Sequence, residues 1–374
     1  MSAQPTRILQ IVPRMSPDVD GVGDYALQLA HELCDLNQIH SDFLVVRPHP
    51  QRQSQVDRFS VHSLDSHTVQ GVLQRVPDDI STIFLQYSNY PYLQGKLDAP
   101  MWLADALNVL KQRGLRIVVM FHELPTLRYK RIRCPNFLQR RVSRRLAQIA
   151  DVVVTNNTAF QQTLAQWAQV YCVPNFSTIG EAATVKPLAA RKRSLVVFGS
   201  SDRTRVYRNN IETINCICNT LAIDTLYDVG RPVDWDHQGI NVKVVRTGFL
   251  SATDISQLLA ESLAGVFDYR RFPQNLAKST VYAAYCSHGM VPICNAHGLK
   301  PQDNIAANHH YLVSSNLKEF AQPSTLQVIA DNAYAHYQTR TLAQCARRFA
   351  ELINPVQSAQ TVNTDLYTKP EARV

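Results

Sequence analysis

The segment 7–33 constrains the fold of this chain more than any other, because it encodes a buried strand, a loop and an amphipathic helix in succession. Residues 8–12 form a short apolar run that ends at Pro13, a pattern typical of a buried strand. Apolar side chains then recur at helical spacing, at Leu27, Ala30, Leu33 and Cys34. The loop between them contains Gly21 and Gly23 and leads into the start of the helix, where backbone N–H groups and the helix dipole favour a bound phosphate. The segment therefore predicts an α/β unit with an anion site at these two glycines.

The spacing of Gly21, Gly23 and Ala26 also matches the dinucleotide-binding fingerprint, in which the first glycine directly follows the strand. Here about eight residues separate the strand from Gly21, so the approach to the glycines differs from that motif. The acid that the fingerprint expects after the second strand is also missing, because Arg47 follows the apolar run 44–46. A nicotinamide-dependent dehydrogenase is therefore one alternative, and a loop that needs glycine only for its turn is another.

Length and composition favour a folded, two-domain enzyme in the cytoplasm. The chain has 374 residues, of which 45% are hydrophobic and 18% are charged, as in well-packed globular proteins. No apolar run approaches the roughly 20 residues of a membrane span, and the N-terminal residues have no signal-peptide core. The eight cysteines lack the paired spacing of a metal site, and Cys216 and Cys218 stand only two apart in a predicted helix. We therefore expect reduced cysteines, no metal and no cofactor.

The net charge of +8 is concentrated in the stretch 124–150, which contains no acidic residue. An apolar stripe at helical spacing predicts that 137–149 is an amphipathic helix with outward-facing arginines. The basic residues of the stretch are Arg128, Lys130, Arg131, Arg133, Arg140, Arg141, Arg144 and Arg145. Such a face attracts phospholipid, nucleic acid or an acidic glycan, unless it is merely solvated. Because no recognisable nucleic-acid-binding module accompanies it, we expect no nucleic-acid partner, and we name an anionic membrane surface on the cytoplasmic side as the partner of Arg128–Arg145.

The rest of the chain alternates strand and helix patterns, which predicts βαβ units with parallel sheets. In the first half we expect strands at 43–46, 82–87, 115–121, 151–156 and 170–175, and helices at 101–112, 137–149 and 158–169. In the second half we expect strands at 195–199, 242–245, 264–267, 291–293 and 311–313, and helices at 210–221, 254–262, 278–288 and 325–353. The pattern fades between the halves. We therefore predict an N-terminal domain at 1–175, a linker at 176–193, a C-terminal domain at 194–353 and a polar tail at 354–374.

Several short landmarks occur in an order and spacing that resemble the GT-B glycosyltransferases of family 4. In the first half these are Gly21-Val22-Gly23-Asp24-Tyr25, Leu85-Gln86-Tyr87, Phe121-His122-Glu123 and the run 150–155. In the second half they are Val197-Phe198-Gly199-Ser200, Gly248-Phe249-Leu250-Ser251 and the run 283–293. The resemblance covers most of the chain. It implies the GT-B fold, in which two Rossmann-like, doubly wound α/β domains face each other across a cleft, and it implies retaining, metal-independent transfer of a sugar from a nucleotide-sugar donor.

The resemblance places the acceptor in the first domain and the donor nucleotide in the second. It implies that Gly21 and Gly23 cradle the diphosphate from the first domain, and that the second domain holds it through Ser200, Arg205, Lys278, Ser279 and Thr280. Arg203 and Arg208 are near-equivalent alternatives to Arg205. A solvated side chain is the alternative role for any one of these arginines.

Three residues of the first domain receive catalytic roles from the same resemblance. His122 matches the histidine that touches the donor sugar in the family, with a structural histidine as the alternative. Glu123 orders its loop or contacts the acceptor, with an exposed loop acid of no function as the alternative. Asp24 is a candidate base on the acceptor side, although retaining transfer needs no strong base. The segment Gln86–Tyr90 is expected to line the acceptor side or to pack in the core.

The chain departs from the family at the loop that precedes Gly289. The family has a pair of glutamates there that contact the donor sugar and the ribose, whereas counting back from Gly289 finds Ala277 and Ala284 in their places. Lys278, followed by two hydroxyl residues at a helix start, still fits a diphosphate site. The first hypothesis is therefore a glycosyltransferase that transfers a sugar to a glycan or glycolipid acceptor in cell-surface polysaccharide synthesis. The second is a catalytically inactive GT-B-fold protein that binds a nucleotide or glycan as a partner subunit.

Overall fold

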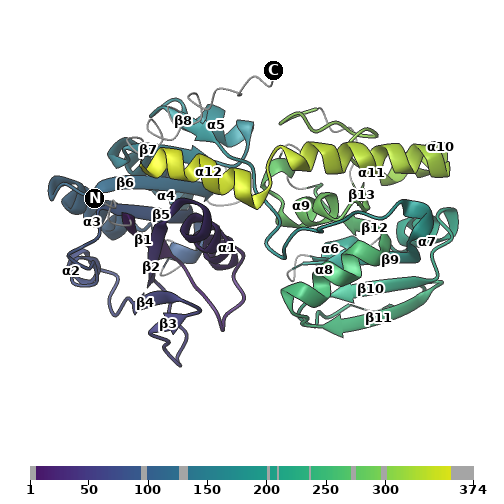
Figure 1. The fold of residues 1–374 in the computed structure, drawn as a ribbon, viewed down its shortest axis with the longest axis horizontal. Helices are drawn as coiled ribbons and strands as arrows, with labels where there is room; N and C mark the ends of the chain where they lie inside the picture. Colours follow the sequence, from purple (N-terminus) through teal and green to yellow (C-terminus); the bar gives the residue numbers. More distant parts are fainter. Residues whose placement is uncertain are drawn as a thin grey trace, which may run out of the picture. The chain divides into compact units, whose positions relative to one another are not determined.

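The computed structural model describes residues 6–93, 99–125, 134–199, 203–208, 210–235, 237–270, 275–295 and 301–354. Within these ranges the chain forms two compact units, each built around a mainly parallel β-sheet (Figure 1). The first unit contains the described parts of Met1–Asn156, Phe160–Val173 and Leu342–Val374, and the second contains those of Asn157–Ala159 and Pro174–Thr341. The predicted pair of α/β domains with parallel sheets is confirmed.

The first unit is built on strands in the order β3-β4-β2-β1-β5-β6-β7-β8, all parallel except for the antiparallel pair β3 and β4. The strands are β1 Thr6–Val12, β2 Ile39–Val45, β3 Gln55–Val56, β4 Phe59–Ser63, β5 Thr82–Ser88, β6 Arg116–Glu123, β7 Val152–Thr155 and β8 Val170–Cys172. The helices that accompany them are α1 Gly21–Asn37, α2 Val69–Leu73, α3 Met101–Gln112, α4 Cys134–Ile149, α5 Thr158–Leu164 and α12 Leu342–Ile353.

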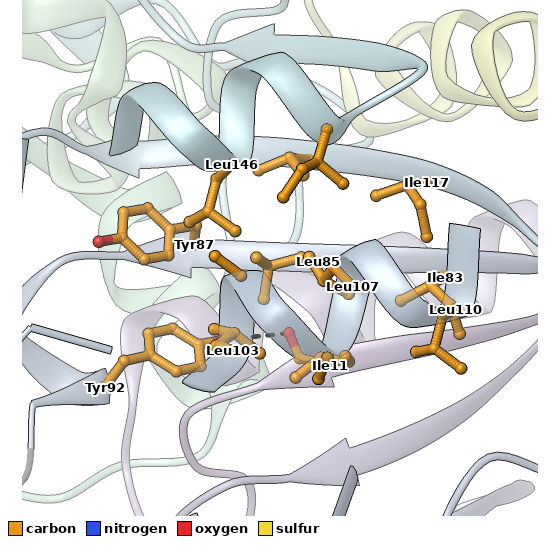
Figure 2. Close-up of a cluster of buried hydrophobic side chains, with 14 of the residues drawn as sticks. Ile11, Ile83, Leu85, Tyr87, Tyr92, Leu103, Leu107, Leu110, Ile117 and Leu146 are labelled. Atoms are coloured by element: carbon orange, nitrogen blue, oxygen red, sulfur yellow. Dashed lines mark hydrogen bonds between the residues drawn. The ribbon is translucent and has the colours of Figure 1, made fainter. Parts of the chain in front are cut away.

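The larger apolar core of the first unit lies between one face of the sheet and the helices α3 and α4 (Figure 2). Side chains alternate between the two faces of a strand, so every second residue of the central strands points into this core. The residues labelled in Figure 2 show the packing: Ile11, Ile83, Leu85, Tyr87, Tyr92, Leu103, Leu107, Leu110, Ile117 and Leu146. The opposite face is covered by α1 and α12, where the ring centroids of Phe84 and Phe349 lie 5.4 Å apart. Burial of each such side chain contributes roughly 1.5–3 kcal/mol to stability.

The second unit is built on parallel strands in the order β11-β10-β9-β12-β13-β14. The strands are β9 Lys192–Phe198, β10 Thr225–Val229, β11 Lys243–Gly248, β12 Ser262–Phe267, β13 Val291–Cys294 and β14 Leu312–Val313. The helices are α6 Thr204–Tyr207, α7 Ile211–Thr220, α8 Ala252–Glu261, α9 Thr280–Ser287, α10 Leu317–Phe320 and α11 Pro323–Gln338.

The two central strands of the second sheet, β9 and β12, separate beyond Gly265, and a tyrosine side chain fills the gap. The paired residues end at Gly265 and Val196. The buried Tyr285 of α9 places its hydroxyl at this point, where it accepts a hydrogen bond from the Phe198 N–H (3.1 Å) and donates one to the Val196 carbonyl (3.1 Å). A Cβ on Gly265 would lie 2.5–2.6 Å from three atoms of this ring. Glycine is therefore required there by the close approach of the tyrosine.

Two features differ from the sequence-based expectation. The predicted C-terminal domain, 194–353, includes α12, but this helix packs against α1 and belongs to the first unit (yellow in Figure 1). The predicted elements also omit the strands β3, β4 and β10 and the short helices α2, α6 and α10. β10 is missing from the prediction because a charged residue, Asp228, interrupts its apolar run, and the structure shows that this carboxylate is buried and paired.

Candidate functional site

Each sheet has one place where the order of its strands reverses direction. In the first sheet the chain runs outward from β1 through β2 on one side and from β5 through β8 on the other. In the second sheet the reversal lies between β9 and β12. Ligands of open parallel sheets bind outside the carboxyl ends of the strands at such reversal points. The loops that follow β1, β5, β9 and β12 are therefore the places to look for a site, and most of the predicted residues follow these strands.

The start of α1 is capped by a side chain of the chain itself. Asp20 Oδ1 accepts hydrogen bonds from the backbone N–H groups of Val22 and Gly23, each at 3.0 Å. These two donors are the ones that a phosphate at this helix start would use. A Cβ on Gly23 would overlap the carbonyl oxygen of Arg14, whereas a Cβ on Gly21 would have open space around it. Close packing against Arg14 is therefore one reason for glycine at position 23. Phosphate binding by Gly21 and Gly23 stays a prediction, and a phosphate would have to compete with Asp20 for the same N–H groups.

The two glycines should respond differently to alanine. Gly23→Ala is expected to destabilise the first unit by about 1–3 kcal/mol, because the added methyl group displaces the backbone at Arg14. Gly21→Ala, the matched control, should leave stability unchanged or raise it slightly, because alanine is a better helix former. Urea unfolding of both variants measures the difference. Equal losses in the two variants would contradict this explanation.

Asp24 lies in the first turn of α1 and has a perturbed acidity. Burial, together with the nearby charge of Asp20, raises the pKa of Asp24 to about 6. A carboxyl group with such a pKa can accept or release a proton near neutral pH, which is the property expected of a general base or acid. The catalytic role of Asp24 stays a prediction, now with a chemical property that suits it.

The raised pKa of Asp24 predicts a pH-dependent gain in stability for Asp24→Asn. Because the folded-state pKa of about 6 lies above the ordinary value of 3.8, the ionised carboxylate destabilises the folded state at pH 7–8, and this destabilisation disappears as the pH falls through 6 toward 3.8. Asp24→Asn should therefore gain about 3 kcal/mol at pH 8 and much less, about 0.5 kcal/mol, at pH 4. Urea unfolding at both pH values tests this, with the exposed Asp78→Asn as the control. A gain of the same size at pH 4 and pH 8 would contradict it.

His122 and Glu123 end the strand β6, as the sequence predicts. The buried imidazole of His122 places Nε2 2.8 Å from Gln86 Oε1, and the Tyr25 ring meets it edge-on with 4.8 Å between ring centroids. Glu123 is half-buried and accepts a hydrogen bond from the Ser88 hydroxyl at 3.4 Å. In the segment expected to line the acceptor side, residues 86–89 are buried and only Tyr90 is exposed. Their burial favours core packing over direct contact with an acceptor, and the acceptor-side role of this segment stays a prediction.

The predicted donor residues of the second unit follow its two central strands. Arg205 lies in α6, after β9, and is half-buried, whereas Ser200 lies outside the described residues. Lys278 and Thr280 are half-buried and lie after β12, on either side of the buried Ser279. The Ser279 hydroxyl caps α9 by accepting a hydrogen bond from the Tyr282 N–H at 3.1 Å. One cationic residue thus follows each of the two strands at the reversal point of this sheet, Arg205 after β9 and Lys278 after β12.

Arg203 has a structural role that sequence reasoning missed. Its guanidinium is buried and pairs with the buried carboxylate of Asp228, with Nε 2.7 Å from Oδ1. It also donates to the carbonyl oxygens of Gly199 and Arg231, which follow β9 and β10. Arg203 therefore ties together the loops at the carboxyl edge of the sheet, and it is a weaker candidate than Arg205 for direct phosphate binding. The only sequence signal was a lone aspartate within the β-branched and aromatic run of β10.

The two alanines that stand where the resemblance to family 4 would place glutamates lie inside the protein. Ala277 and Ala284 are 1% and 0% exposed and belong to the apolar core of the second unit. A glutamate at either position would place a carboxylate among apolar side chains. Among the residues that the structure describes, no cluster of three or more histidine, cysteine, aspartate or glutamate side chains is arranged to hold a metal ion.

The outward face of α4 forms a basic groove of about 910 Å³ with the residues that follow α5. It is lined by Phe137, Arg140, Arg141, Arg144, Arg145, Gln148, Gln166 and Trp167. The guanidinium of Arg140 lies over the Trp167 ring, 5.7 Å from its centroid, and Arg145 pairs with Asp105 at 2.6 Å. The four other basic residues predicted for this stretch, from Arg128 to Arg133, lie outside the described residues. None of the helices described here is both long and apolar enough to cross a bilayer.

Comparison with known proteins gives structural neighbours only. No family model matches the sequence, and no curated protein matches it. Among solved structures, the pneumococcal O-GlcNAc transferase GtfA in complex with UDP and GlcNAc has a TM-score of 0.63 at 8% identity, over 94% of this chain and 99% of that one. An α-glucosyltransferase (AGT) in complex with UDP has a TM-score of 0.58 at 12% identity, over 93% and 99%.

A third neighbour is WaaG, a glycosyltransferase involved in lipopolysaccharide biosynthesis, with a TM-score of 0.57 at 14% identity over 93% of this chain and 99% of that one. The match therefore runs through both units and nearly the whole of each neighbour. At sequence identities of 8–14%, this structural match establishes the fold alone. The chain has the GT-B fold of these glycosyltransferases, as its sequence landmarks predict.

Proposed function

We propose that this protein is a retaining glycosyltransferase that moves a sugar from a nucleotide-sugar donor to a glycan or glycolipid acceptor in cell-surface polysaccharide synthesis. The observation that carries the proposal is the match of both units to glycosyltransferases, two of which are described in complex with UDP. A uridine diphosphate sugar is accordingly the first donor to test. The lipopolysaccharide role of WaaG, another neighbour, supports the choice of a surface glycan as acceptor.

In this proposal the second unit holds the leaving diphosphate. Transfer from a nucleotide sugar needs stabilisation of the negative charge that develops on the leaving diphosphate. Lys278 and Arg205 supply positive charge after the two central strands, and the Thr280 hydroxyl stands at the start of α9. Side-chain cations of this kind make a metal ion unnecessary. We therefore expect turnover to survive removal of divalent ions with EDTA.

The first unit supplies the groups around the reacting sugar. His122 contacts the donor sugar, and Glu123 and Asp24 face the acceptor. A retaining transfer depends on placing the acceptor hydroxyl near the anomeric carbon more than on a strong base. Asp24, with its pKa of about 6, then assists proton removal without being indispensable.

Thermal shift against UDP-, GDP-, TDP- and ADP-sugars and the free nucleotides tests the donor site. A ligand at 100 times its dissociation constant stabilises by roughly 2.7 kcal/mol, which is readily detected. We expect one nucleotide series to stabilise the protein, and Lys278→Met to abolish that shift. The control is Lys318→Met, an exposed lysine of the same unit in α10, which should keep the shift.

Product analysis separates the proposal from its alternative. The buried Ala277 and Ala284 in place of two glutamates are the reason for considering the alternative, an inactive GT-B-fold protein that binds a nucleotide or glycan as a partner. Donor hydrolysis or transfer that is lost in a Lys278→Met/His122→Ala double variant would support the enzyme. A thermal shift without turnover of any donor would favour the inactive binding protein. No shift with any nucleotide would overturn the enzyme and leave only a glycan-binding form of the alternative.

The basic groove on α4 is the proposed contact with an anionic membrane at the cytoplasmic face. Arg140, Arg141 and Arg144 are exposed, and the Phe137 side chain, which also lines the groove, is 67% exposed. Arginines bind lipid phosphates while an exposed aromatic ring enters the interface between head groups and acyl chains. This combination favours a membrane over a nucleic acid. Peripheral attachment would bring the enzyme to a lipid-linked acceptor.

Vesicle co-sedimentation tests the membrane contact. We expect binding to vesicles that contain phosphatidylglycerol and none to pure phosphatidylcholine, with weaker binding at high salt. Arg141→Gln/Arg144→Gln should weaken the binding severalfold, whereas the exposed Arg113→Gln, beyond the end of α3, should not. Binding to duplex DNA but not to anionic vesicles would overturn this contact.

A further inference from the structure

Four buried polar side chains form a continuous hydrogen-bonded row across the first sheet. They come from neighbouring strands: Ser41 of β2, Gln10 of β1, Gln86 of β5 and His122 of β6. Gln10 Nε2 donates to Ser41 Oγ at 3.0 Å, and Gln86 Nε2 donates to Gln10 Oε1 at 2.8 Å. His122 Nε2 lies 2.8 Å from Gln86 Oε1. The two glutamines and the serine are fully buried, and His122 is 6% exposed.

The strand register shows that this row crosses the sheet diagonally. Gln10 is paired in register with Phe43 and Phe84, so Ser41 lies two residues earlier and Gln86 two residues later along their strands. Gln86 is in turn paired with Met120, two residues before His122. All four side chains therefore point to the face covered by α1 and α12. The row runs from the interior of the sheet to the carboxyl edge, where the candidate site lies.

The two amides give the row a direction. A primary amide donates through nitrogen and accepts through oxygen, so each glutamine fixes the role of its neighbour. Gln86 uses its nitrogen to donate to Gln10 and therefore offers His122 only an oxygen. His122 Nε2 must then carry the hydrogen that completes the contact.

We infer that this row fixes His122 as its Nε2–H tautomer, and that Gln86 and Gln10 are positioning residues for the proposed sugar transfer. In the neutral ring Nδ1 is then an acceptor and not a donor, which suits a hydroxyl group of a sugar. The hydrogen bonds of the row can reverse their direction only if both glutamine amides rotate by half a turn together. A buried amide that rotates alone would place a donor against a donor or an acceptor against an acceptor. The edge-on ring of Tyr25 holds the plane of the imidazole. The sugar contact rests on the proposed function, whereas the tautomer does not.

Nitrogen NMR of the protein labelled with ¹⁵N-histidine tests the tautomer directly, since the protonated and bare nitrogens of a neutral ring have well-separated shifts. The His122→Gln variant identifies the signals of His122 among the 12 histidines. We expect a single Nε2–H tautomer at pH 8. Gln86→Leu removes the acceptor and Gln10→Leu frees the Gln86 amide, so both variants should give a mixture of tautomers. Gln28→Leu, a partly exposed glutamine of α1, should leave the signals unchanged.

An Nδ1–H tautomer in the native protein, or an Nε2–H signal that persists in both leucine variants, would overturn the inference. Kinetics then link the row to transfer. If His122 contacts the sugar, Gln10→Leu should lower kcat/KM for the donor about tenfold while the thermal shift with the free nucleotide is kept. A fixed tautomer in a protein without turnover would support the row and count against the proposed enzyme, so the two failures are distinguishable.

Discussion

Replacing Arg203 by methionine is expected to lower the melting temperature of the second unit by roughly 10 °C. The change leaves the carboxylate of Asp228 buried without its main partner, and breaking one side of a buried ion pair costs about 3–5 kcal/mol. For a unit of this size, 1 kcal/mol corresponds to about 2–4 °C. The Tyr207 hydroxyl, 3.0 Å from Asp228 Oδ1, and Arg246, 3.9 Å from Oδ2, compensate only part of the loss. Calorimetry measures the shift.

A double-mutant cycle separates the ion pair from mere loss of packing. Arg203→Met with Asp228→Leu removes both charges and should recover a large part of the stability that either single change loses. Arg208→Met, an exposed arginine on the same segment, is the matched control and should stay within about 0.5 kcal/mol of the native protein. A double variant as unstable as the sum of the two single ones would show that the charges do not act as a pair.

Gly265→Ala should destabilise the second unit by about 2–3 kcal/mol, although alanine is otherwise better than glycine in a strand. The added methyl group would come within 2.5–2.6 Å of three atoms of the Tyr285 ring, which is fully buried. The ring cannot move without giving up the hydrogen bonds of its hydroxyl to the Phe198 N–H and the Val196 carbonyl. Urea unfolding measures the loss.

Two companion variants test the cause. Tyr285→Phe keeps the ring and leaves the Phe198 N–H without its partner, so it should cost about 1–3 kcal/mol. Tyr285→Leu makes room for the methyl group, and adding Gly265→Ala to it should cost less than the same change costs in the native background. An additive result would mean that the ring is not what excludes alanine at this position.

Much of the fold is readable from the sequence because its signals are local. The apolar run 8–12, the strand patterns at 82–87 and 115–121 and the helical spacing at 137–149 all reappear as elements of the structure. The features that escaped prediction depend on distant contacts. β10 carries an aspartate whose burial makes sense only beside Arg203, and α12 looks like the last helix of the second unit until its packing against α1 is seen.

The candidate site could be predicted only as a set of residue types at strand ends. The sequence places His122 and Glu123 at the end of β6, as the structure has them, and Lys278, Ser279 and Thr280 at a helix start, although α9 begins only at Thr280, with Ser279 as its N-cap. It cannot show that Asp20 occupies the N–H groups at Gly23, because a capping carboxylate and a phosphate suit the same helix start. Nor can it show that Gln86 is buried against His122, because glutamines occur more often at surfaces.

Because α12 packs on the first unit, the second unit is an insertion within the first along the chain. A fragment that stops near residue 175 lacks Phe349 and exposes the buried ring of Phe84 beneath it. Exchange of the second unit between related proteins therefore needs two junctions, one near residue 173 and one near residue 341. A chimera with a single junction between the units would combine the first sheet of one parent with the α12 of the other. The residues of α12 that contact α1 would then have to be changed to those of the parent that supplies α1.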